Sequence, residues 1–173
     1  MKKIINNILH RFKEDSLSKR NEAVERIVEY QSLKDIKTCL IFWVADANQN
    51  EWLRQFIQHF PNVKINKLCF ISSGVEMLVT DDIVVMHNED LGFGGKIQND
   101  SLLAMLKERY DLFVDLTTVS NAMIDYVLLN SQAKCIVGMK KEGARADITI
   151  DSVSGQLEFI DKLAEILVKV NKY

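Results

Sequence analysis

Residues 110–139 read YDLFVDLTTVSNAMIDYVLLNSQAKCIVGM, and this stretch decides the fold class. An apolar run at 112–116 is interrupted only by Asp115 and meets a cluster of Thr, Ser and Asn. An amphipathic segment and a second apolar run at 135–137 follow. Neither run alternates apolar with polar residues, which is typical of parallel strands covered on both faces. The stretch therefore predicts a strand, a helix and a strand joined in a right-handed βαβ unit.

Outward from this unit, the chain alternates apolar runs with amphipathic segments. Besides the strands near 112–116 and 133–137 and the helix near 120–129 that form this unit, we predict strands near 38–46, 63–71, 83–86 and 147–150, and helices near 48–60, 99–110 and 154–170. The link before the 83–86 strand is short for a helical crossover, so that strand could pair antiparallel or follow an irregular link. This order predicts an α/β fold, a three-layer sandwich with a mostly parallel, Rossmann-like sheet of five to six strands.

The first part of the chain differs from the rest, so we divide it into an N-terminal helical arm, residues 1–33, and a Rossmann-like domain, residues 34–173. The arm is predicted to contain a basic amphipathic helix with the stripe Ile4, Ile5, Ile8, Leu9 and Phe12, then a second helix, capped by Ser18, with the stripe Val24, Ile27, Val28 and Gln31. We expect the arm to pack on its own domain or on a second copy. A protein partner or a peripheral membrane contact is the less favoured alternative.

Composition and charge exclude several classes of protein. The chain has 173 residues, 47% of them hydrophobic and 27% charged, which suits one globular domain. Its formal net charge of −2 predicts no nucleic-acid partner. No apolar run approaches the roughly 20 residues that span a bilayer and no signal peptide is evident, so we expect a cytoplasmic protein. Cys39, Cys69 and Cys135 lie inside apolar runs far from histidines, so we predict packed thiols, no metal and no cofactor.

The segment LGFGGK, residues 91–96, is the nearest approach to a phosphate-binding loop. Gly94 and Gly95 would let backbone amides approach an anion, and Lys96 would add a positive charge. The segment matches neither GxxxxGK[ST] nor a GxGxxG after the first strand. An ordinary turn that requires positive φ is the alternative.

Polar residues at the predicted strand ends are the other candidate ligand-binding groups. Asp46, Asp115 and Asp151 fall in or at the ends of strands, where carboxylates bind Mg²⁺ or transfer protons. The alternative is that Asp46 bonds nearby loop amides and Asp151 caps the last helix. Asp115 stands out because a carboxylate within an apolar strand needs partners. Thr117 and Thr118 follow it at the carboxyl end of the strand, where such sheets bind ligands.

Two phrases carry a family resemblance, YDLFVDLT at 110–117 and NSQAKCIVGM at 130–139. With IKTCLIFWVAD at 36–46 and DLGFGGK at 90–96, they resemble an uncharacterised family of small bacterial α/β proteins that open with a basic helical arm. The two phrases also look like the N-terminal half of heptosyltransferase-type glycosyltransferases, although this chain is too short to hold their second, sugar-nucleotide-binding domain. These resemblances imply a fold and no activity or catalytic residue.

From the sequence we expect a non-enzymatic cytoplasmic binding or protein-interaction module that uses its arm. The alternative is a small enzyme or a nucleotide- or sugar-phosphate-binding protein using Asp46, Lys96, Asp115 and Thr117. A pocket lined by those polar groups would favour the alternative, whereas an exposed apolar patch on the arm would favour the module.

Overall fold

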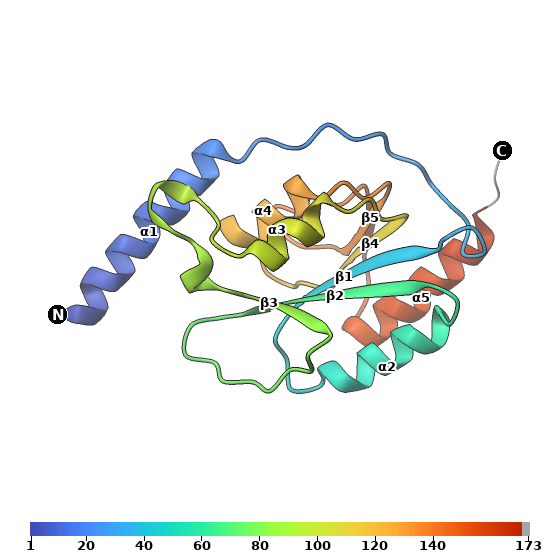
Figure 1. The fold of residues 1–173 in the computed structure, drawn as a ribbon. Coiled ribbons are helices and arrows are strands. Elements are labelled where there is room, and N and C mark those ends of the chain that lie inside the picture. The colour runs from blue at the N-terminus through green and yellow to red at the C-terminus, as the bar shows by residue number, and fades with distance from the viewer. Residues whose placement is uncertain (171–173) are drawn as a thin grey trace.

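A computed structural model describes residues 1–170 and contains one six-stranded sheet with helices on both faces (Figure 1). The strands are β1 (Thr38–Val44), β2 (Lys64–Ile71), β3 (Ile83–His87), β4 (Leu112–Asp115), β5 (Ile136–Met139) and β6 (Ile148–Ile150); the helices are α1 (Lys2–Arg20), α2 (Gln49–His59), α3 (Asp100–Lys107), α4 (Ala122–Asn130) and α5 (Gln156–Lys169), with short 3-10 turns η1 (Asn88–Asp90) and η2 (Phe93–Gly95). The order is β3-β2-β1-β4-β5-β6 and each neighbouring pair is parallel. The predicted α/β sandwich is confirmed, and β3 follows an irregular link and pairs parallel with β2.

The core has two halves, one on each side of the sheet. Helices α2 and α5 cover one face, and α3 and α4 cover the other (Figure 1). Strand β1 serves both halves because successive side chains point to opposite faces, with Ile41 and Trp43 on the α2 and α5 side and Leu40 and Phe42 on the other. Burial on both faces explains why the sequence of β1 is continuously apolar.

The predicted second helix of the arm is wrong, because residues 21–32 run as an extended segment and residues 33–35 form a turn. We call residues 21–35 the strap. The amide of Val24 donates to the carbonyl of Leu129, and the amides of Glu29 and Leu33 donate to the carbonyls of Lys134 and Leu167. Those acceptors lie near the ends of α4 and α5 and before β5, so the strap runs along the amino-terminal edge of the sheet. Backbone groups bonded to distant carbonyls cannot also form the bonds of a helix.

Candidate functional site

A buried polar cluster at the end of β4 contains two of the predicted site residues. The side chains of Asp115 and Lys141 are 1% and 5% exposed, and their charged atoms lie 2.8 Å apart. The Asp115 carboxylate also accepts hydrogen bonds from the amide of Thr117 at 3.0 Å and from its hydroxyl at 2.6 Å. Gly138 is the register partner of Asp115 on β5, and it lies directly beside the Asp115 side chain.

Every hydrogen-bond donor of the Lys141 ammonium finds its partner within this cluster. The three protons of the Lys141 ammonium have three acceptors, namely Oδ2 of Asp115, Oγ1 of Thr117 and the carbonyl of Val119. The network ties the loop after β4 to the loop after β5 and leaves no ammonium donor for a ligand. Sequence reasoning selected Asp115 and Thr117 but missed Lys141. Lys141 could have been found from the sequence, because a lone buried carboxylate needs a cation as its partner. Lys141 lies two residues beyond the end of β5, the neighbouring strand.

The other strand-end residues lie outside this cluster. Asp46 is half-buried and accepts a hydrogen bond from the amide of Asn48 at 2.7 Å, as the loop-amide alternative expected. It lines a shallow hollow of about 340 Å³ beside the first turns of α2 and α5, together with Glu51 and Glu158. Three carboxylates make this hollow a poor anion site. Thr118 is exposed. Ligand binding by Asp46 or Thr118 stays a prediction.

The glycine loop at residues 91–96 holds α1 against the domain. Gly95 has a φ of +72°, and a Cβ there would lie 2.5 Å from the backbone nitrogen of Leu17. Gly94 also has a φ of +72° and faces Arg20, whereas Lys96 is exposed. The positive φ values match the turn alternative, and α1 fills the space beside Gly95 that an anion would need. Anion binding by Lys96 stays a prediction.

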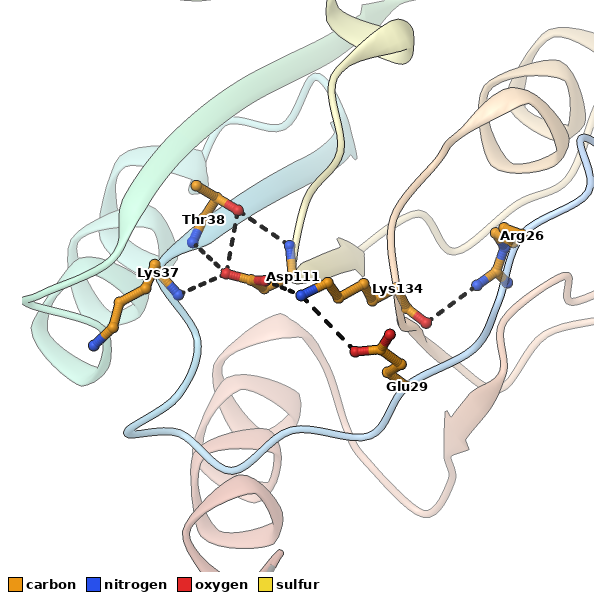
Figure 2. Close-up of polar contacts among 6 residues, drawn as sticks. All are labelled: Arg26, Glu29, Lys37, Thr38, Asp111 and Lys134. Carbon is orange, nitrogen blue, oxygen red and sulfur yellow. Dashed lines mark hydrogen bonds and ion pairs between the residues drawn. The ribbon is translucent and has the colours of Figure 1, made fainter. Parts of the chain in front are cut away.

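A second polar cluster, centred on Asp111 at the amino-terminal edge, was not predicted (Figure 2). Its carboxylate accepts hydrogen bonds from the amides of Lys37 at 2.9 Å and Thr38 at 3.1 Å, and from the Lys134 ammonium at 2.9 Å. Lys134 also pairs with Glu29 of the strap at 3.9 Å. Burial opposes ionisation of Asp111, but these hydrogen bonds outweigh it and hold the pKa of the carboxyl below its ordinary value.

Arg26 fixes the middle of the strap. Its guanidinium bonds both oxygens of Asp147, at 2.6 and 2.7 Å, and donates to the carbonyl of Ala133 at 3.1 Å. Asp147 also accepts from the amide of Ile136 at the start of β5. Both charged side chains are largely buried and one nitrogen, Nη2, contacts both carboxylate oxygens, so this charge-assisted ion pair attaches the strap to the sheet.

Helix α1 presents an apolar face to solvent. We call Ile4, Ile5, Ile8, Leu9 and Phe12 the outward face; these side chains are between 39% and 66% exposed. Leu17, the buried residue of α1, comes nine residues after Ile8, about two and a half turns along, and so lies on the opposite side of the helix. The end of α1 near the strap rests on the domain, and Figure 1 shows its N-terminal part extending beyond the other elements. The arm therefore packs on its own domain through Leu17 and the strap, but the stripe does not take part in that contact, and packing of the stripe on a second copy stays a prediction.

Other features offer little chemistry. A groove of about 670 Å³ lies between the strap, the turn after α2 and the end of α5, at the amino-terminal edge and not the carboxyl edge where such sheets bind ligands. Burial raises the pKa of Cys69 to about 12 and of Cys135 to about 11, and raises that of Cys39 further, so these thiols stay protonated. Within residues 1–170, no three His, Cys, Asp or Glu side chains are placed to hold a metal ion, and no helix has the length and apolarity to cross a membrane.

The model of a family described as being of unknown function (DUF6913) matches residues 6–169, nearly the whole chain. No curated protein and no solved structure matches significantly.

Proposed function

The chain belongs to this family of unknown function, and we propose that it is a binding module whose Rossmann-like domain presents α1 as a docking helix. The outward face is the observation that carries the proposal. Single exposed apolar residues are common on protein surfaces, but five on one side of a helix form a continuous patch. At roughly 100 Å² for each side chain, the patch covers on the order of 500 Å², as large as the largest patches on typical monomers.

The way α1 is attached supports this proposal. The backbone of α1 contacts Gly95 closely at Leu17, and the strap that follows α1 is fixed through Arg26 and through backbone hydrogen bonds to the domain. In proteins most of the stability of a helix comes from its packing against the rest of the fold. A helix held in place by a domain loses less conformational freedom when it binds, and this favours docking.

The test compares how the wild type and two variants sediment after gentle lysis of cells that make the protein naturally. The variant Ile4→Ser/Ile8→Ser/Phe12→Ser, called the outward-face variant, replaces three of the five apolar side chains of the outward face by polar ones. The matched control Ile57→Ser/Leu78→Ser/Val168→Ser makes the same chemical change at side chains that are 44%, 99% and 65% exposed elsewhere. In gently lysed cells, we expect the wild type and the control to sediment with material larger than the 19.9 kDa chain, and the outward-face variant to sediment as the free chain. The same sedimentation for all three proteins would contradict the proposal.

A further inference from the structure

We propose that the outward face of α1 binds the surface of an anionic lipid bilayer, an inference that rests on the proposed role of α1 as a docking helix. In this arrangement the helix lies along the membrane, its apolar side chains enter the boundary between headgroups and acyl chains, and its basic side chains contact lipid phosphates.

The distribution of charge favours an anionic partner. Residues 1–13 contain four basic residues, Lys2, Lys3, Arg11 and Lys13, and no acidic residue. The other 160 residues hold 18 basic and 24 acidic residues, a formal charge of −6. The positive charge is therefore concentrated around the outward face, while the rest of the chain would be repelled by an anionic surface. This orients the protein with α1 toward the lipid.

Three of these four basic residues border the apolar face, and together they lie on both sides of it, whereas Lys3 lies on the opposite side of the helix. At about 100° per residue, Arg11 lies beside Ile4 at one border, and Lys2 and Lys13 lie beside Leu9 at the other. Long basic side chains at such borders can reach lipid headgroups while their methylene groups cover apolar surface. The Lys13 ammonium also lies 5.0 Å from the ring centroid of Phe93, which is 76% exposed and adds an aromatic side chain at this border.

The size of the outward face favours a lipid surface over a second copy of the chain as its partner. If two outward faces packed together they would bury about 1,000 Å² in total, below the roughly 1,200–2,000 Å² of stable protein interfaces. The outward face spans residues 4–12, about 14 Å of helix, which is too short to cross a hydrocarbon core of about 30 Å. A short helix with one apolar face and basic borders fits the plane of the membrane interface.

The test measures co-sedimentation of the purified full chain with vesicles. The probes are vesicles of phosphatidylcholine alone and vesicles with about one-third phosphatidylglycerol, which carry a negative surface potential. We expect the wild type and the Ile57→Ser/Leu78→Ser/Val168→Ser control to bind the anionic vesicles at least about tenfold more tightly than the neutral ones. The outward-face variant should lose binding to both kinds of vesicle. Lys2→Gln/Arg11→Gln/Lys13→Gln, which removes the charges at both borders, should lose the preference for anionic lipid.

Three results would overturn the lipid inference. They are the absence of wild-type binding to anionic vesicles, equal binding of the wild type and the outward-face variant, and a concentration-dependent dimer of the free chain that the outward-face variant abolishes. If vesicle binding fails while sedimentation in cells still depends on the outward face, the docking role stands and its partner is a protein. If the outward face matters in neither experiment, both proposals fail.

Discussion

Replacing Gly95 by Ala tests how α1 is held. Gly95 has a φ of +72°, and an added Cβ would lie 2.5 Å from the nitrogen of Leu17 and 2.7 Å from the carbonyl carbon of Ser16. Both atoms belong to the backbone of α1, so the helix must move away. We expect the free energy of unfolding to fall by about 1–2 kcal/mol because alanine is strained at this φ. It should fall by roughly a further 1.5–3 kcal/mol because Leu17, which is buried in the wild type, becomes exposed.

Gly74→Ala is the matched control for this change. Gly74 has a φ of +82°, and a Cβ there would meet no atom within 4 Å. Gly74→Ala should therefore lower the free energy of unfolding only by the roughly 1–2 kcal/mol that the strained φ costs. Urea unfolding followed by the fluorescence of Trp43 and Trp52, both buried, measures the free energy of unfolding of each variant. Amide hydrogens of residues 14–20 should also exchange faster in Gly95→Ala. If Gly95→Ala unfolds within about 0.5 kcal/mol of Gly74→Ala, the close contact does not hold α1.

Two further predictions concern the polar clusters. Asp111→Asn should lower the free energy of unfolding by about 1–3 kcal/mol at pH 7, because it weakens the charge-assisted bonds from Lys134 and from the amides of Lys37 and Thr38. The pKa of Asp111 is lowered by folding, so its stabilisation is present above the unfolded pKa of about 4 and is lost as the pH falls through the folded pKa. Urea unfolding of both proteins from pH 7 to pH 3 should show the difference shrinking below about pH 4; a constant difference would refute this assignment. Lys141→Met should lower the free energy of unfolding by about 3–5 kcal/mol, because it leaves the Asp115 charge buried and unpaired. Thermal or urea unfolding should show recovery when Asp115→Asn is added, and a single variant as stable as the wild type would exclude this role.

The sheet could be predicted because its signal is local. Each strand is a short apolar run, and the run from Leu112 to Val114 lacks alternation because α2 and α5 cover one face of the sheet and α3 and α4 the other. The pairing of β3 depended on the path of residues 72–82, where neither periodicity nor a turn motif specifies a direction.

The errors lie where distant residues decide the structure. Val24, Ile27 and Val28 have helical spacing, yet the strap is extended because its amides bond to carbonyls more than a hundred residues away, and Ile27 is exposed. Periodicity predicted the first helix correctly, but it could not show which side meets the domain, because the contact between Leu17 and Gly95 decides that. Asp115 was recognised as unusual from its apolar surroundings, whereas its partner Lys141 is 26 residues away.

The measurement that tests the central claim most directly is the thiol reactivity of Ile8→Cys. The three native cysteines are buried, so an introduced thiol on α1 is readily distinguished. Ile8 belongs to the outward face, and Asn7→Cys places an exposed control thiol on the polar side of the same helix. The docking account predicts that both thiols react rapidly in the purified protein, and that in cells that make the protein Cys at position 8 is protected while Cys at position 7 still reacts. Equal reactivity of the two positions in those cells would contradict the account.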